Sequence, residues 1–215
     1  MLRVWGRRSS FNVQKVMWLA GELGLAHERI DAGSIFGGLD TPDFLAMNPH
    51  GRIPVIADGN AIVWESHAIL RYLAARHGAP QFWSDDPAVR AQVDGWMDWS
   101  HTALQPDFLV GVFWGFYRMP EEKRNWPAIE AALARCAVDF GKRDRLLDGR
   151  AFLLGDRPPF ADITAGTSLY RYHGLEIERP NLPRLERWYR TLQEREPYRT
   201  HVMIPFGELR GRYYD

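Results

Sequence analysis

The chain has 215 residues, of which 46% are hydrophobic and 13% aromatic, enough for the core of one large or two small domains. Its 27 basic residues balance its 27 acidic ones, so overall charge gives no attraction to nucleic acid or to an anionic membrane. One cysteine, Cys136, excludes an intramolecular disulfide and a cysteine-based zinc site, and the seven histidines form no H-E-x-x-H pattern. We therefore predict no metal and no nucleic-acid partner.

The first residues, MLRVWGRRSSFNV, lack the apolar core of a signal peptide. No run in the chain approaches the roughly 18 apolar residues that a membrane span requires. We therefore expect a cytoplasmic protein that does not contact a membrane.

The chain opens with a short apolar strand over residues 2–5 and a polar loop over residues 6–12. Apolar residues at helical spacing then predict a helix that begins near Val13 and stops at Gly24. Residues 27–32 form a second strand. A right-handed crossover makes the two strands parallel.

A Gly-rich loop over residues 33–40 precedes Thr41-Pro42-Asp43, which is typical of a helix N-cap followed by proline at the first helical position. An Asn48-Pro49 turn follows and leads into the apolar strand 54–57. Pro54 stands at the head of that strand, where a missing N–H donor is tolerated.

Asp58-Gly59 is a strong hairpin signal and joins this strand to a second one over residues 61–64. Glu65-Ser66 then opens a helix, with Ser66 as its expected N-cap and Gly78 as its terminator. The first domain is therefore predicted to span residues 1–78.

Residues 78–87 are rich in Gly, Pro and Asp and form the expected linker. The remainder is predicted to be helical, with a second domain over residues 88–205 and a tail over 206–215. Its expected helices cover residues 88–99, 127–147, 161–172 and 183–194. The first of these helices is expected to continue beyond residue 99 and to be broken at Pro106.

The order of proline, strand, turn, strand, Glu-Ser and helix resembles the second half of the glutathione-binding domain of cytosolic glutathione transferases. The segment GDRPPFADITAG is similar to the capping segment of the central helix in that family's C-terminal domain, although Pro159 replaces the usual Ser or Thr three residues before Asp162. The resemblance implies an α/β thioredoxin-like N-terminal domain followed by an all-α C-terminal domain.

The resemblance also implies roles in binding glutathione. In the family the proline is cis, the residue before it offers its backbone to the cysteine moiety, and the Glu-Ser pair holds the γ-glutamyl end. Two basic residues are further candidates near the glycine carboxylate. The implied binding residues are Ile53, Pro54, Glu65, Ser66, Arg52 and His50.

The family's catalytic side chain lies in the loop between the first strand and the first helix. This loop contains neither Tyr nor Cys, so the chain resembles serine-type bacterial members of the theta, zeta or nu kind. Ser10 is the implied donor to the glutathione sulfur, with Asn12 as a second polar group and Ser9 as an adjacent competitor. A purely structural interpretation, in which Ser10 and Asn12 only cap the helix, stays open.

An aromatic-rich stretch, GWMDWSHTALQPDFLVGVFWGFYRMP, corresponds by position to the helices that line the family's electrophile pocket. Trp114 and Tyr117, three residues apart and thus on one face of an α-helix, are our candidates for contact with the second substrate. The C-terminal tail, PFGELRGRYYD, is expected either to cover the pocket or to dock on the surface.

Three functions stay open. The first is a glutathione transferase in detoxification, which directs a glutathione thiolate at a small apolar or aromatic electrophile. The second is a glutathione-dependent disulfide-bond oxidoreductase, because the S-x-N spacing of Ser10 and Asn12 occurs in such relatives. The third is a non-catalytic binding protein of the same fold. The resemblance implies a homodimer in each case.

Overall fold

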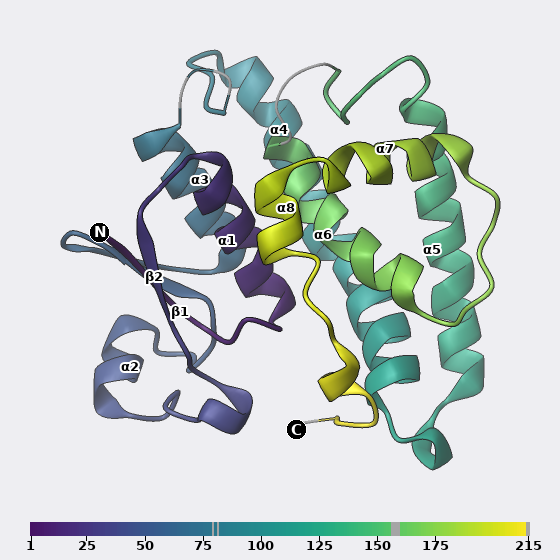
Figure 1. Cartoon of the computed structure of the whole chain (residues 1–215), viewed down its shortest axis with the longest axis horizontal. Helices are drawn as coiled ribbons and strands as arrows, with labels where there is room; N and C mark the ends of the chain where they lie inside the picture. The colour runs from purple at the N-terminus through teal and green to yellow at the C-terminus, as the bar shows by residue number, and fades with distance from the viewer. Residues whose placement is uncertain (79, 81, 156–159, 214–215) are drawn as a thin grey trace. The chain divides into compact units, whose positions relative to one another are not determined.

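The computed structural model describes residues 1–78, 80, 82–155 and 160–213. The chain divides into two compact units. Unit 1 comprises Met1–Asp85 and Glu196–Ile204, and unit 2 comprises Asp86–Arg195 and Pro205–Asp215 (Figure 1). The sequence assigned residues 88–205 to the helical domain, whereas the structure groups the segment Glu196–Ile204 with unit 1.

Unit 1 is built on a four-stranded mixed sheet in the order β2-β1-β3-β4. The strands are β1 (Leu2–Trp5), β2 (His27–Ile30), β3 (Val55–Asp58) and β4 (Ala61–Trp64). β1 is parallel to β2 and antiparallel to β3, and β3 is antiparallel to β4. The predicted parallel crossover and the hairpin at Asp58-Gly59 are therefore confirmed.

Among its described residues, unit 1 also contains four helices and one short turn of 3-10 helix. They are α1 (Phe11–Glu22), η1 (Ser34–Phe36), α2 (Pro42–Met47), α3 (Ser66–His77) and α8 (Glu196–His201). Gly24 ends the first helical segment at φ +62°, a left-handed conformation that favours glycine. Thr41 caps α2 as predicted, because its side chain accepts a hydrogen bond from the Phe44 backbone N–H at 3.4 Å.

The prediction that Ser66 caps α3 was wrong. Ser66 is the first helical residue, and the N-cap position belongs to Glu65, whose side chain makes no capping hydrogen bond. Glu65 has φ +68°, a conformation that non-glycine residues rarely adopt. The sequence pattern placed the helix start correctly but did not reveal this backbone conformation.

The helix α8 escaped the sequence analysis because it has only six residues and no clear apolar period. It packs against α1, where the rings of Trp18 and Tyr198 meet edge to face with centroids 4.7 Å apart. Gly21 permits this close approach, since a Cβ there would lie 2.8 Å from Pro197 Cβ. Both aromatic rings are fully buried, so this contact is part of the core of unit 1.

Unit 2 is helical. Its elements are α4 (Pro87–Trp99), η2 (Ser100–Arg118), η3 (Glu121–Lys123), α5 (Trp126–Leu146), α6 (Phe160–Gly174), α7 (Pro183–Gln193) and η4 (Gly207–Leu209). The expected helices are present in the expected order. The thioredoxin-like domain followed by a helical domain is therefore confirmed.

Pro106 does not break its helix, contrary to the prediction. The segment η2 is a π-helix that continues through this residue. In a π-helix each N–H bonds to the carbonyl five residues back, as Met119 does to Trp114 at 2.8 Å. The wider turn keeps the proline ring clear of the preceding carbonyl, with which it would clash in an α-helix.

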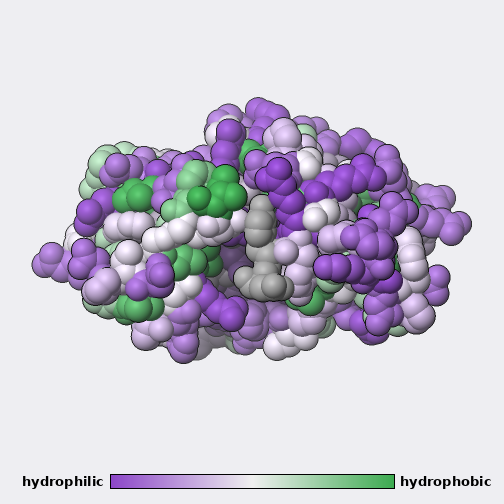
Figure 2. All heavy atoms as spheres, turned by 90° about the horizontal axis from the view of Figure 1, so that it is seen from below, coloured by the Kyte–Doolittle hydropathy of each residue, from purple (hydrophilic) through white to green (hydrophobic). Residues whose placement is uncertain are grey.

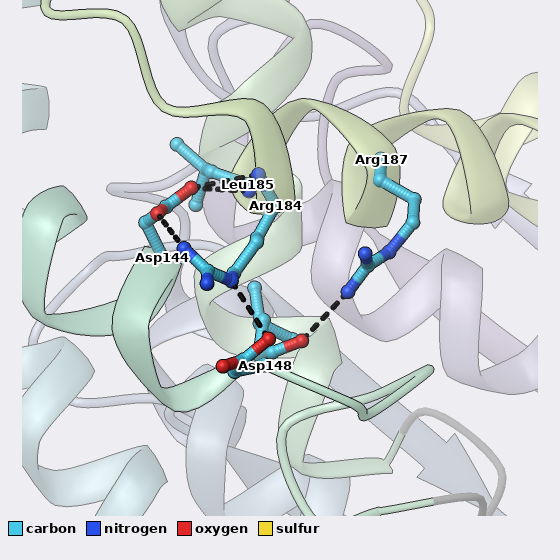
Figure 3. A network of polar contacts seen from close by, with 6 residues as sticks. Asp144, Asp148, Arg184, Leu185 and Arg187 are labelled. Atoms are coloured by element: carbon cyan, nitrogen blue, oxygen red, sulfur yellow. Dashed lines mark hydrogen bonds and ion pairs between the residues drawn. The ribbon is translucent and has the colours of Figure 1, made fainter.

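Asp144, in the last turn of α5, forms hydrogen bonds with the first turn of α7 (Figure 3). Asp144 is buried, and its Oδ1 accepts hydrogen bonds from the backbone N–H groups of Arg184 at 2.8 Å and Leu185 at 3.0 Å. The helix α7 has no side-chain cap of its own at Leu182. A carboxylate forty residues earlier therefore satisfies the first donors of α7.

A second buried carboxylate, Asp162, lies in the first turn of α6. Its Oδ1 accepts hydrogen bonds from Leu153 N at 3.0 Å and from Trp188 Nε1 at 2.6 Å. Burial raises its pKa to about 7. Pro159, which replaces the usual capping residue, lies outside the described residues.

The C-terminal tail docks within unit 2, on η2 and α6. The Phe206 ring lies 5.1 Å from Tyr117 and 5.8 Å from Tyr170, measured between centroids. Gly211 N donates to the Tyr117 carbonyl at 3.0 Å, and Arg118 Nε donates to the Arg212 carbonyl at 3.0 Å. Backbone and ring contacts thus hold the tail in place.

On the face shown in Figure 2, hydrophobic residues form separate patches among hydrophilic ones. Among the described residues, no helix is both long and apolar enough to cross a membrane.

Candidate functional site

The sheet register brings three predicted segments of unit 1 to one end of the sheet. Trp5 pairs with Val55, and Val55 pairs with Trp64, so these residues form one row across β1, β3 and β4. β1 and β4 end at this row, whereas β3 begins there. The loop with Ser10, the Ile53-Pro54 pair and the Glu65-Ser66 pair therefore all leave the sheet from the same end.

The loop after β1 lies against the Ile53-Pro54 segment. A Cβ on Gly6, whose φ is +149°, would lie 2.4 Å from Val13 Cγ2 and 3.4 Å from Ile53 Cβ. The backbone at Gly6 is fixed on its other side, because Gly6 N donates to the Ile30 carbonyl at 2.8 Å. This close approach requires glycine and brings the start of α1 toward the strand β3.

Ser10 occupies the N-cap position of α1 with an extended backbone, φ −76° and ψ 124°. Its carbonyl accepts the first helical hydrogen bond from Gln14 N at 2.9 Å, but its side chain makes no capping hydrogen bond. Both Ser10 and Ser9 are 8% exposed. The hydroxyl of Ser10 thus lies at the N-terminus of α1 but does not cap the helix.

Asn12 is held by a lysine that the sequence analysis did not single out. Lys15 Nζ lies 3.1 Å from Asn12 Oδ1 and 3.1 Å from His67 Nε2 on α3. Lys15 has no exposed surface, and burial lowers its pKa to about 7, although the charge of Glu65 opposes the shift. The spacing of three residues between Asn12 and Lys15 signals a shared helix face, but only the fold brings His67 to it.

The Ile53-Pro54 bond is cis, as the resemblance implied. The preceding loop is organised by Asn48, a buried residue that the sequence analysis treated only as part of a turn. Asn48 Nδ2 donates to the Arg52 carbonyl at 2.8 Å, and Asn48 Oδ1 accepts from His50 N at 3.1 Å. The Asn-Pro dipeptide signals such a side-chain turn.

Glu65 and Ser66 stand where β4 passes into α3. Glu65 is exposed, and its carbonyl accepts from Ile69 N at 2.9 Å, whereas Ser66 is buried. Positive φ at a residue other than glycine is strained, and such strain clusters at ligand sites. The start of α3 also presents backbone N–H groups that favour a negatively charged ligand group.

The two basic candidates differ in their surroundings. His50 is exposed, its ring centroid lies 5.2 Å from that of Trp64, and it lines a hollow of about 380 Å³ together with the loop 33–40. Arg52 is also exposed and directly follows Gly51, which lines the same hollow.

Trp114 and Tyr117 lie on η2 in unit 2 and contact different partners. The Trp114 ring lies 6.2 Å from Tyr213, and the Tyr117 ring stacks on Phe113 at 5.4 Å. Our premise that residues three apart share a face holds for an α-helix and not for this π-helix. Their contact with a second substrate stays a prediction.

The single cysteine is unsuited to nucleophilic chemistry. Cys136 is buried in α5, and burial raises the pKa of its thiol to about 12. Across residues 1–78, 80, 82–155 and 160–213, no group of three His, Cys, Asp or Glu side chains is placed to hold a metal ion.

Residues 1–75 match the family model described as "Glutathione S-transferase, N-terminal domain". The chain is 40% identical over 207 residues to the glutathione S-transferase GstB of Escherichia coli K12, covering 95% of this chain and 99% of that protein. It is 32% identical over 162 residues to the mouse glutathione S-transferase theta-1, covering 70% of this chain and 65% of the relative.

Solved structures are similar over nearly the whole chain. A theta class glutathione S-transferase from Xanthomonas axonopodis pv. citri, solved with glutathione bound, has a TM-score of 0.89 at 41% identity and covers 95% of this chain and 98% of its own. A glutathione S-transferase from Pseudomonas fluorescens has a TM-score of 0.79 at 26% identity, covering 91% of this chain and 96% of its own.

Proposed function

The chain belongs to the glutathione S-transferase family, and from that premise we propose that unit 1 binds glutathione at the end of its sheet and that Ser10 holds the sulfur as a thiolate. The observation that supports this most strongly is the row of Trp5, Val55 and Trp64, from which all three binding segments depart. The enzyme uses glutathione as its co-substrate.

Each part of glutathione has a proposed partner. The backbone of Ile53, before the cis proline, pairs with the cysteine moiety. The γ-glutamyl end is held by Glu65, whose carboxylate suits its amino group, and by Ser66 at the start of α3. Arg52 and His50 serve the glycine carboxylate, since both are exposed and follow Asn48 in one loop.

A single hydroxyl is sufficient to activate the thiol. Lowering a thiol pKa from about 8.5 by about two units requires roughly 2.7 kcal/mol. A hydrogen bond to a charged group contributes about 1.5–3 kcal/mol, and a helix N-terminus contributes about 0.3–1 kcal/mol more. Ser10 stands at the N-cap of α1 with its side chain unused for capping, so it meets both conditions.

The reaction that follows is attack of the thiolate on an electrophilic carbon. A carbon–sulfur bond forms and a leaving group such as chloride departs with the electron pair of the broken bond. We propose that the second substrate is apolar or aromatic and that Trp114 and Tyr117 help to select it. We also propose a detoxification role for a cytoplasmic homodimer.

Glutathione-dependent disulfide reduction is the second candidate. One glutathione thiolate attacks a disulfide, and a second glutathione resolves the mixed disulfide, giving oxidised glutathione and two thiols. The observation that favours it is the Lys15–Asn12 contact at 3.1 Å, which fixes the Asn12 amide beside the reactive loop. This route needs no protein thiol, in keeping with the buried Cys136.

One set of measurements separates these candidates. Ultraviolet titration of bound glutathione in the wild type and in Ser10→Ala gives the thiol pKa in each. Turnover of a chlorinated aromatic acceptor is then compared with that of a small disulfide. An unchanged pKa in Ser10→Ala excludes Ser10 as the activating group. Absence of glutathione binding by calorimetry would instead indicate a non-catalytic protein.

A further inference from the structure

A buried lysine and a buried histidine meet where the two helices of the proposed glutathione site pack together. The helices α1 and α3 lie side by side in unit 1 (Figure 1). Lys15 Nζ on α1 lies 3.1 Å from His67 Nε2 on α3, and both residues are buried. The proposed function uses Lys15 only through its contact with Asn12 and gives His67 no role.

The contact between Lys15 and His67 permits two arrangements of protons. A hydrogen bond between two nitrogens needs a proton on one and a lone pair on the other. Either the Lys15 ammonium donates to a neutral imidazole, or the N–H of the His67 imidazole donates to a neutral amine. Protonation of both residues would place two positive charges 3.1 Å apart in a buried position, which is unfavourable. The pair therefore carries one positive charge or none.

The surroundings of Lys15 balance these two forms. Asn12 Oδ1 accepts from Nζ at 3.1 Å, the Phe11 ring lies 4.8 Å from Nζ, and the Glu65 carboxylate favours the charged form by its own charge. Burial acts in the opposite direction and is the larger effect, so the pKa of Lys15 is lowered to about 7. A charge brought by a ligand can therefore shift the balance near neutral pH.

Other titratable groups on the elements packed against α1 and α3 contact different residues. Those on α3 and β3 are Tyr72, Arg76 and His77, which all contact Asp58. Those on α8 are Tyr198, which meets Trp18, His201, which meets His27, and Glu196, which accepts from Thr200. Glu65 is thus the charged residue of the proposed glutathione site that acts on Lys15.

Glutathione adds negative charge at this position, because its thiolate form carries two carboxylates, one thiolate and one ammonium group. We propose, on the basis of the proposed function, that Lys15 is a positioning residue that takes up one proton from solution when glutathione binds, so that the Lys15–His67 pair is positively charged in the complex. This charge stabilises the thiolate. The contact of Lys15 with Asn12 Oδ1 also turns the amide N–H groups of Asn12 away from the lysine.

S-Methylglutathione tests the pair by itself, because this ligand has no thiol proton to lose. Calorimetry at pH 8 in buffers of different ionisation enthalpy gives the number of protons taken up on binding. A Lys15 amine with a pKa of about 7 is about one-tenth protonated at pH 8. If binding raises this pKa to about 8, the uptake is about 0.4 proton per chain.

Variants of the three-lysine set identify the source of the proton. Lys15→Met should still bind S-methylglutathione but take up almost no proton, and Lys15→Arg should do the same because a guanidinium stays charged at pH 8. Lys123→Met, which changes an exposed lysine, should take up as much as the wild type. Unchanged uptake in Lys15→Met would overturn the proposal, because another group such as His50 would then be the source.

The wild-type protein gives a second readout that needs no variant. Its three lysines are Lys15, Lys123 and Lys142, and the last two are exposed. In protein with carbon-13-labelled lysine, the signal that titrates near pH 7 should be that of Lys15, and saturating S-methylglutathione should raise its midpoint by about one pH unit. A midpoint that does not move would overturn the proposal even if the Lys15 variants do not fold.

Failure of this proposal and failure of the proposed function give different results. The difference in proton exchange between glutathione and S-methylglutathione at one pH reports ionisation of the thiol. Equal values for the two ligands would contradict the thiolate, whereas zero uptake with bound S-methylglutathione would contradict only the role of Lys15. If neither ligand binds, the glutathione site and this proposal both fail.

Discussion

Lys15 Nζ on α1 lies 3.1 Å from His67 Nε2 on α3, and the same nitrogen lies 3.1 Å from Asn12 Oδ1. This buried contact joins the helix that begins at Ser10 to the helix that begins beside Glu65. The two ends of the proposed glutathione site are therefore coupled through one lysine. Replacing Lys15 should change both ends of the site.

Ser10→Ala should raise the pKa of the bound glutathione thiol by about one to two units and lower kcat/KM about 10- to 100-fold. Both effects are expected because the variant loses one hydrogen bond to a charged group. Ultraviolet titration and steady-state kinetics measure the two effects. Folding stability should change by less than about 0.5 kcal/mol, because the side chain makes no capping bond.

A true capping residue supplies the control for Ser10. Asn125 caps α5 by accepting from Ala128 N at 3.2 Å, so Asn125→Ala should lose about 1 kcal/mol in urea unfolding. If Ser10→Ala loses as much stability as Asn125→Ala with no change in thiol pKa, Ser10 is a structural cap.

Lys15→Met and Asn12→Ala should act on the same step. Each should lower kcat/KM roughly three- to tenfold, about 1 kcal/mol, because each breaks the hydrogen bond that orients the Asn12 amide. The double variant should be no worse than Lys15→Met alone, which a double-mutant cycle in kcat/KM measures. Strictly additive losses would show that Lys15 does not act through Asn12.

Lys15 should also make stability depend on pH. Its folded pKa of about 7 lies below the ordinary value of 10.5, so the unfolded chain binds more protons between these values. Stability therefore rises with pH from about 7 to about 10, by up to ~1.4 kcal/mol per pH unit. Urea unfolding of the wild type and of Lys15→Met at pH 7 and 9 isolates the effect, and parallel pH profiles would contradict it.

Asp162 should make folding stability depend on pH with the sign opposite to that of Lys15. Its pKa is raised from 3.8 to about 7, so the folded protein binds more protons between these values and loses stability as pH rises through the window. Asp162→Asn should remove the slope, up to ~1.4 kcal/mol per pH unit. Unfolding at pH 5 and 7.5 tests this. Asp162→Ala is the contrasting variant, destabilised at both pH values because Leu153 N and Trp188 Nε1 lose their acceptor.

Asp144→Ala should destabilise unit 2 by about 2 kcal/mol or more, because the N–H groups of Arg184 and Leu185 are left without their acceptor. Thermal unfolding measures the loss. Asp148→Ala removes only the exposed ion pair with Arg184 and should change little, so it serves as the matched control. Equal losses in the two variants would mean that the ion pair, and not the cap, holds α7.

Much of the fold of unit 1 could be predicted because its signals are local. The Thr41-Pro42 cap and the Asp58-Gly59 turn each act over a few residues, and the structure has both. The proline, Glu-Ser and serine-loop motifs identified the family through a resemblance. The burial of Lys15 and the role of Asn48 were missed, since both depend on partners that only the folded chain brings close.

By itself the sequence determined the order of strands and helices, the two-domain plan and the family, because turn residues, caps and apolar periods act between near neighbours. The tertiary structure decided what depends on distant partners. In the folded chain the helix η2 continues through Pro106, α8 packs against Trp18, and the C-terminal tail contacts Tyr117. Folding also brings Asp144 to the start of α7 and Arg143 against the Trp99 ring. Packing and desolvation set those outcomes, and neither is a property of a short stretch of chain.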